Sequence, residues 1–240
     1  MGEDASMRGL FITGTGTEIG KTHVAAMIVR ALVADGHRVG VYKPAASGCR
    51  REDGAIVADD AVALWEAAGR PESLERVCPQ RFLAPLAPHL AAAAEGRRID
   101  EALLVDGAAY WRGKCDVLVV EGAGGLMSPL ADEMYNADLA VALRLPLVVV
   151  TANVLGTIHQ TLTTLIAAAA FDEGLPIAGI VLNHVHDSRS VSSGHGDTDL
   201  SVDSNRDEIA RRAVPEVLAE VHFGERTFSE PIDWFALAAP

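Results

Sequence analysis

The chain has 240 residues, 49% of them hydrophobic, which is enough apolar material to fill the core of one large α/β domain. Its formal net charge of −13 argues against a nucleic-acid partner, because binding to phosphate backbones requires clustered Lys and Arg. The three cysteines are scattered, which indicates neither disulfides nor a zinc site and favours a reducing cytoplasm.

The first residues, 1–7, are polar and acidic and lack the apolar core of a signal peptide. We therefore expect a disordered leader, followed by a single domain over residues 8–240. The Ala-rich stretches near Ala91 and Ala167 are too short and too close to charges for a membrane span, so we expect packed helices there and no membrane partner.

Short β-branched or Leu-rich runs recur along the chain, with helix-like segments between them. The runs are almost continuously apolar, as is typical of parallel strands that helices cover on both faces. The sequence therefore predicts a doubly wound, mainly parallel sheet, in which ligands bind at the carboxyl ends of the strands. The expected strands are Leu10–Thr13, Val39–Tyr42, Val117–Glu121, Leu147–Thr151 and Ile177–Asn183.

The C-terminal part of the chain is less regular. Residues 186–206 are dense in Ser, Gly and Asp and contain few large apolar residues, which predicts a flexible loop. Beyond the loop we expect a short helix over Asp207–Val214, a last strand over Val217–Val221 and a turn of helix over Pro231–Leu237.

The first strand runs directly into the glycine-rich segment Gly14–Thr22, which the helix-like segment His23–Ala34 follows. This context favours a phosphate loop over a simple glycine-rich turn. Backbone N–H groups would face the phosphates, Lys21 would reach the β- and γ-phosphates, and the Thr22 hydroxyl would bind Mg²⁺. Thr15 stands where the general pattern has its first glycine, so the loop is a longer variant.

Three carboxylates occur where a metal-bound triphosphate could use them. Glu18 lies inside the loop and would repel phosphate unless Mg²⁺ or a cationic substrate were nearby; otherwise it points into solvent. Glu121 ends an apolar strand, which is the position of an acid that holds Mg²⁺. Asp60 either completes the Mg²⁺ shell or, with Asp59, caps the helix-like segment Ala61–Ala68.

A second lysine and a second glycine run also follow predicted strands. Lys43 precedes a proline and would supply a fixed positive charge to a phosphoryl group or an anionic nucleophile, unless it is a solvated surface lysine. Ser47 would add a neutral donor. Gly124 and Gly125 either present N–H groups to an anion or form only a tight turn.

Together these motifs resemble, in order and spacing, those of the dethiobiotin synthetase family. The longer phosphate loop is the form that this family uses. The resemblance covers roughly residues 10–183 and is carried by Gly14–Thr22, Tyr42-Lys43-Pro44 with Ser47-Gly48, Asp60, Pro88-His89 with Glu95-Gly96, and Val120–Gly125.

The resemblance implies an ATP- and Mg²⁺-dependent cyclo-ligase of biotin biosynthesis. Such an enzyme converts 7,8-diaminononanoate and CO₂ into dethiobiotin, with ADP and phosphate as the other products. One amine forms a carbamate, the carbamate attacks the γ-phosphate, and the second amine displaces phosphate to close the ureido ring. The resemblance also implies a cytoplasmic homodimer with its active site near the interface. The preferred nucleotide stays open, and another NTP could replace ATP.

The same resemblance implies a role for each matching residue. Lys21, Lys43 and Thr17 would act in catalysis, and Thr22, Asp60 and Glu121 would bind Mg²⁺. The nucleotide would contact Gly16, Thr17, Glu18, Ile19, Gly20, Lys21, Thr22 and, at its base, Asn183, for which a turn residue is the alternative. The substrate would contact Thr17, Lys43, Ser47 and Gly124, and its carboxylate tail would bind the partner subunit at a helix start formed by Gly156 and Thr157.

Three positions depart from the family pattern. His159-Gln160 replaces an Asn-His pair, Ala87 replaces a serine, and His222 replaces a proline that contacts the base. These changes concern the grip on the substrate tail and the selection of the base, and they leave the phosphate chemistry unaffected.

Two other functions fit the predicted sheet less well. Partition and septum-positioning ATPases, which act through protein partners, carry an additional lysine where this chain has Gly16. Many of them also have basic surfaces or a basic amphipathic helix, whereas residues 231–240 contain no Lys or Arg. The amidating synthetases of cobalamin synthesis carry a glutamine-hydrolysing domain, for which this chain has no residues left.

Overall fold

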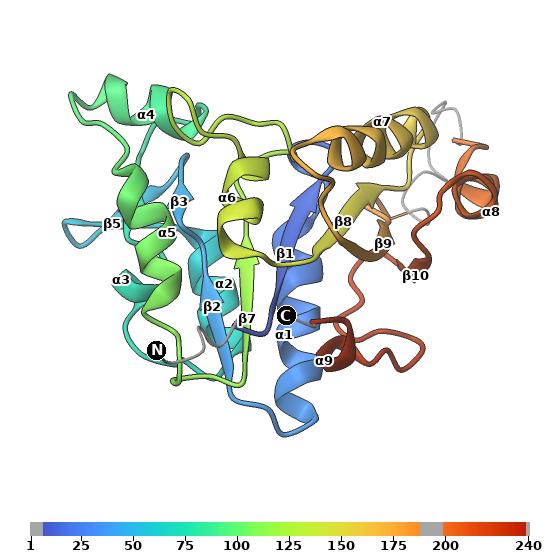
Figure 1. Cartoon of the computed structure of the whole chain (residues 1–240), viewed down its shortest axis with the longest axis horizontal. Coiled ribbons are helices and arrows are strands. Elements are labelled where there is room, and N and C mark those ends of the chain that lie inside the picture. Colours follow the sequence, from blue (N-terminus) through green and yellow to red (C-terminus); the bar gives the residue numbers. More distant parts are fainter. Residues whose placement is uncertain (1–6, 188–198, 239–240) are drawn as a thin grey trace.

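The computed structural model describes residues 7–187 and 199–238, so the leader predicted at the start of the chain lies almost entirely outside the described residues. A six-stranded parallel sheet forms its centre, in the order β10-β9-β8-β1-β7-β2 (Figure 1). These strands are β1 (Gly9–Gly14), β2 (Val39–Tyr42), β7 (Val117–Glu121), β8 (Leu147–Ala152), β9 (Ile177–Asn183) and β10 (Val217–Val221). The five strands predicted from the apolar runs and the last strand predicted over Val217–Val221 are confirmed.

Short strands and nine helices complete the described part of the chain. The parallel pair β3 (Ala45–Ala46) and β6 (Gln80–Arg81) and the antiparallel pair β4 (Arg50–Glu52) and β5 (Ala55–Val57) form two small sheets. The helices are α1 (Lys21–Ala34), α2 (Asp59–Ala67), α3 (Leu74–Val77), α4 (Pro88–Ala94), α5 (Glu101–Ala109), α6 (Asn136–Leu143), α7 (Thr157–Ala170), α8 (Val202–Arg212) and α9 (Trp234–Leu237). None of the described helices is long and apolar enough to cross a bilayer.

The connections place helices on both faces of the sheet. The chain crosses from β1 through α1 to β2 in one direction, and from β7 through α6 to β8 in the opposite direction. Because such parallel crossovers are right-handed, α1 and α6 lie on opposite faces, and Figure 1 shows α6 in front of the strands. The predicted doubly wound α/β fold is confirmed, and every residue of β1, β2, β7 and β8 is buried.

The switch in direction falls between β1 and β7, which are neighbours in the sheet. In a doubly wound sheet, the crevice at such a point is where ligands bind. The register pairs Ile12 of β1 with Glu121, and Tyr42 of β2 with Val120. Lys43, one residue past Tyr42, is therefore level with Glu121, and both lie beside the loop that follows β1.

Of the predicted loop 186–206, residues 188–198 lie outside the described residues, and the prediction is wrong at its C-terminal end, because α8 already begins at Val202. Helix α8 is mostly polar, but two of its residues, Asn205 and Ile209, face inward and are buried. The Asn205 side chain donates hydrogen bonds to Asn153 Oδ1 (2.8 Å) and to the carbonyl of Val154 (3.3 Å). Tertiary contacts therefore stabilise a helix that apolar periodicity does not reveal.

Candidate active site

The loop between β1 and α1 has the backbone that a phosphate loop requires. Gly20, the N-cap of α1, adopts a left-handed conformation with φ of 82°. A Cβ atom there would lie 2.1 Å from Nδ2 of Asn183, whose amide donates a hydrogen bond to the carbonyl of Ile19 (2.9 Å). Only glycine adopts this left-handed conformation without strain and leaves room for the Asn183 side chain. Through Asn183, β9 holds the end of the loop against the start of α1.

Lys21 folds back over this loop. The residue is buried, and its ammonium group donates a hydrogen bond to the carbonyl of Gly16 (2.8 Å). Burial is the main reason why the pKa of Lys21 lies below its ordinary value. An anion brought into the loop would favour the charged form of the lysine, as a phosphate-binding role requires.

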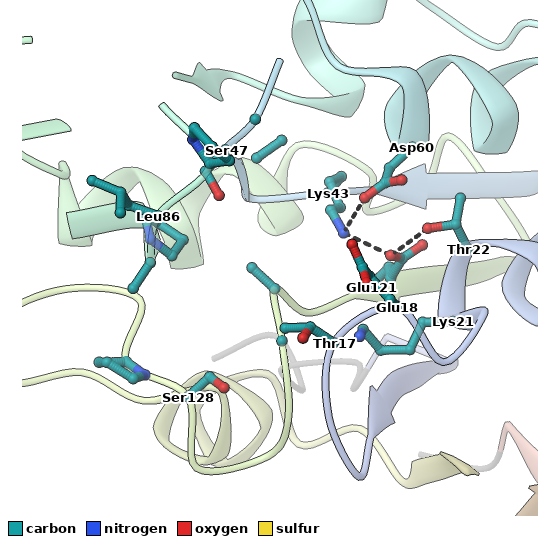
Figure 2. Close-up of a pocket in the computed structure, with 18 of the residues that line it drawn as sticks. Thr17, Glu18, Lys21, Thr22, Lys43, Ser47, Asp60, Leu86, Glu121 and Ser128 are labelled. Carbon is teal, nitrogen blue, oxygen red and sulfur yellow. Dashed lines mark hydrogen bonds and ion pairs between the residues drawn. The ribbon is translucent and has the colours of Figure 1, made fainter. Parts of the chain in front are cut away.

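Lys43 and Glu121 form a buried ion pair at the carboxyl ends of β2 and β7. The Lys43 ammonium group lies 2.6 Å from Glu121 Oε1 and 3.1 Å from Asp60 Oδ2, and it also donates to the carbonyl of Gly122 (3.2 Å). The hydroxyl of Thr22 donates to the same Glu121 oxygen (2.8 Å). Figure 2 shows these four side chains joined on one side of the pocket, with Ser47, Leu86 and Ser128 on the other.

The charges of this cluster stabilise one another. Burial opposes the charge of Lys43, but attraction to Glu121 and Asp60 outweighs it and raises the pKa of Lys43 above its ordinary value. Burial also opposes the charge of Asp60, yet Lys43 holds the pKa of that carboxyl below its usual range. Lys43 is thus a fixed cation, as predicted, and the alternative of a solvated surface lysine is wrong, because its side chain is only 4% exposed.

The residues present fit a bound Mg²⁺ ion. Glu121 Oε2 is buried and has no hydrogen-bond partner within the described residues, although a buried carboxylate oxygen normally has one. Thr22 and Asp60, the other two expected ligands, belong to the same cluster. Two carboxylates and a hydroxyl are the hard oxygen ligands that Mg²⁺ prefers. Asp60 is not a helix cap, since Ala58 is the N-cap of α2.

A cavity of about 810 Å³ brings most of the predicted residues together. Its wall includes both lysines and all three expected metal ligands, so the convergence expected from the sequence is present. The predicted residues that line it are Thr17, Glu18, Gly20, Lys21, Thr22, Lys43, Ser47, Asp60, Glu121 and Gly124.

The other predicted residues do not line this cavity. Gly16 and Ile19 belong to the phosphate loop. The carbonyl of Gly16 accepts a hydrogen bond from Lys21, and that of Ile19 accepts one from Asn183. Gly156 and Thr157 lie at the start of α7, beyond the wall of the cavity. Gly125, expected to present its N–H to an anion, instead donates it to the hydroxyl of Ser128 (2.9 Å).

Asn136 organises the loop after β7, and the sequence analysis missed it. Its amide is fully buried and donates to the carbonyls of Ala123 (2.8 Å), Gly125 (2.9 Å) and Ser128 (3.1 Å), while its oxygen accepts from the N–H of Ala123 (3.1 Å). Gly124 and Ser128 line the cavity as a result. The only sequence signal was an Asn before an apolar run, which is also ordinary for a helix start.

The parallel sheet, the loop between β1 and α1, and Lys21 with Thr22 define a nucleoside-triphosphate-binding protein of the P-loop class. The family model described as AAA domain matches residues 8–227. An ATP-dependent dethiobiotin synthetase of Rhodopirellula baltica is 45% identical over 79% of this chain and 78% of its own length. Another, of Anaeromyxobacter dehalogenans, is 47% identical over 89% of each. The chain belongs to the ATP-dependent dethiobiotin synthetase family.

Solved structures of more distant proteins share the fold. The signal recognition particle receptor FtsY of Elizabethkingia anophelis, in complex with GDP, aligns with a TM-score of 0.57 at 13% identity. The alignment covers 99% of this chain and 64% of the receptor chain. At this identity the likeness concerns the fold alone.

We expect Asn136→Asp to lower the free energy of unfolding by about 3 kcal/mol, because a carboxylate oxygen would replace the donor that faces three carbonyls. Urea unfolding of the whole chain measures the effect. The control Gln160→Glu makes the same amide-to-acid change at an exposed position and should shift stability by less than about 0.5 kcal/mol. Equal stability of the two variants would contradict the role of Asn136.

Proposed function

We propose that this chain carboxylates 7,8-diaminononanoate with CO₂ and closes the ureido ring of dethiobiotin at the cost of ATP, releasing ADP and phosphate. The observation that carries the proposal is the single cavity in which the phosphate loop, Lys43 and the carboxylates Asp60 and Glu121 converge. Membership of the dethiobiotin synthetase family supports the same reaction.

The reaction needs charge neutralisation and alignment more than covalent catalysis. The carbamate oxygen attacks the γ-phosphorus, ADP leaves, and the second amine then attacks the carbonyl carbon of the mixed anhydride and expels phosphate. Both steps develop negative charge on phosphate oxygens. Lys21 would meet the β- and γ-phosphates from the loop, and Lys43 would bind the carbamate and the γ-phosphate from the opposite side.

Mg²⁺, when bound, would neutralise phosphate oxygens and favour departure of ADP. Thr22, Asp60 and Glu121 are the residues of this chain that would hold it. Asp60 and Glu121 also pair with Lys43, whose ammonium group would face the carbamate and the γ-phosphate. Thr17, Ser47 and Gly124, on the cavity wall, would bind the diamine, and Glu18, on the same wall, would attract its ammonium group.

A homodimer would complete the substrate site. The start of α7, at Gly156 and Thr157, does not line the cavity of its own chain, so it would receive the carboxylate tail of a diamine bound to the partner. Leu155, just before α7, is 79% exposed, and Ile166, on α7, is 68% exposed. Such exposure is expected of apolar side chains that a second subunit covers. Sedimentation of the protein as a single chain would contradict the dimer.

A cytoplasmic location fits this metabolism.

The nucleotide base would bind next to Asn183, at the ends of β9 and β10. His222 lies there with its ring 4.6 Å from that of His184, in place of the proline expected at this position. The second departure, Ala87, lies on the cavity wall, and His159 is exposed in the first turn of α7. Because His222 stands in place of that proline, nucleotides other than ATP are compatible with the proposed base site.

Incubation of the protein with diaminononanoate, bicarbonate, Mg²⁺ and each NTP in turn tests the proposal directly. We expect dethiobiotin and phosphate in equal amounts, with at least one NTP. NTP hydrolysis without dethiobiotin would refute the synthetase and favour the nucleotide-switched alternative.

Lys43→Gln should lower kcat by about 100-fold or more, because Lys43 meets charge that develops on the transferred phosphoryl group. The KM of ATP should change by less than about threefold, since Lys21 and the loop hold the nucleotide. Steady-state kinetics separates the two constants. Lys114→Gln, at an exposed lysine, is the matched control. Equal losses in kcat and in apparent ATP affinity would contradict the assignment.

Glu121→Gln should raise the Mg²⁺ concentration for half-maximal activity by about tenfold or more, because a neutral amide attracts a divalent cation less than a carboxylate does. A Mg²⁺ titration at saturating ATP measures this shift. Glu173→Gln removes an exposed carboxylate elsewhere and should leave the titration unchanged. The same half-maximal concentration in Glu121→Gln and wild type would remove Glu121 from the metal site, whatever the change in kcat.

A further inference from the structure

A cluster of four threonine hydroxyls lies next to the phosphate loop, outside the cavity. Its centre is Thr151 of β8, which is fully buried. Thr151 Oγ1 lies 3.2 Å from Oγ1 of Thr15, 2.8 Å from that of Thr157 and 3.0 Å from that of Thr161, which donates to it. Thr157 and Thr161 belong to α7 and are also fully buried.

These three contacts use the full capacity of the Thr151 hydroxyl. A hydroxyl has one proton to donate and two lone pairs to accept with. Thr161 donates to Thr151, so of Thr15 and Thr157 one donates and the other accepts. Two orientations of the Thr151 hydroxyl satisfy all three partners, and the loss of any partner removes one of its three hydrogen bonds.

The cluster connects two elements that bind different ligands. Thr15 is the first residue of the phosphate loop after β1, and its N–H also donates to the carbonyl of Val150 in β8 (3.0 Å). Thr157 is the first residue of α7. The register brings them together, because Gly14 of β1 pairs with Val150, which places Thr15 level with Thr151. Thr151 thus has one hydroxyl partner in the phosphate loop and two in α7.

We propose that Thr151 is a positioning residue that holds the phosphate loop and the start of α7 in place through one hydroxyl, so that binding of nucleotide and binding of diamine both depend on it. The half that concerns the diamine rests on the proposed function, whereas the nucleotide half rests only on the phosphate loop. The cluster also explains Thr15, which replaces the first glycine of the general motif: its side chain is a partner of Thr151.

Thr151→Val tests the inference, because it keeps the shape of the side chain and removes the hydroxyl. Kinetics of the whole protein should show the KM of ATP and the KM of diaminononanoate each raised about threefold to tenfold, with kcat changed by less than about twofold. Thr151→Ser, which restores the hydroxyl, should return both KM values to within about twofold of wild type.

Thr13→Val is the matched control. Thr13 is a buried threonine of the neighbouring strand β1, and its hydroxyl has no hydrogen-bond partner within the described residues. The same substitution there removes no bond, so both KM values should stay at the wild-type level. KM values in Thr151→Val equal to those in Thr13→Val, or a Thr151→Ser variant as impaired as Thr151→Val, would overturn the proposal. A lower melting temperature with unchanged KM values would also overturn it, as a purely structural role.

Two further variants separate the halves of the proposal and decide it should Thr151→Val fail to fold. Thr15→Val should raise the KM of ATP alone, and Thr157→Val that of diaminononanoate alone. The reverse pattern, or no change in either, would contradict the inference. Binding of a fluorescent ATP analogue to each variant needs no turnover, so it tests the nucleotide half even if the protein makes no dethiobiotin and the proposed function fails.

Discussion

The site depends on the buried ion pair between Lys43 and Glu121. Glu121 is the last residue of β7 and Lys43 directly follows β2, two strands in which every residue is buried. Each charge offsets the cost of burying the other. Their 2.6 Å contact follows from the register of β2 and β7. The pair keeps a cation and a carboxylate ready at the edge of the sheet before any ligand binds, so the protein spends little energy on arranging them later.

The ion pair also couples the elements around it. Thr22, at the start of α1, donates to the same oxygen of Glu121 that Lys43 contacts, and Asp60 of α2 approaches the lysine from the other side. Four segments far apart in the sequence therefore meet at one charge cluster. Because the crossover direction changes between β1 and β7, a crevice forms at this edge of the sheet, and the cluster lines the cavity there.

Supporting contacts outside the cavity hold the walls in place. Asn136 shapes the loop after β7 with a single buried amide, and Asn183 closes the end of the phosphate loop against β9. Thr151, through its hydrogen bond with Thr15, holds the start of the phosphate loop against β8. Asn136 and Thr151 contact backbone or other side chains of the protein and do not line the cavity, so their effect on catalysis is exerted through position.

The sequence by itself determined the strands of the central sheet, the phosphate loop and the residue types of the site, because continuous apolar runs and a glycine-rich segment before a helix are local signals. Lys43, Asp60 and Glu121 could be named for the same reason: each follows or begins a recognisable element. Only the tertiary structure decided that Gly125 bonds to Ser128, that α8 begins at Val202, and that Asn136 and Thr151 act as supports. These outcomes depend on partners many residues away, and neither composition nor periodicity carries information about such pairings.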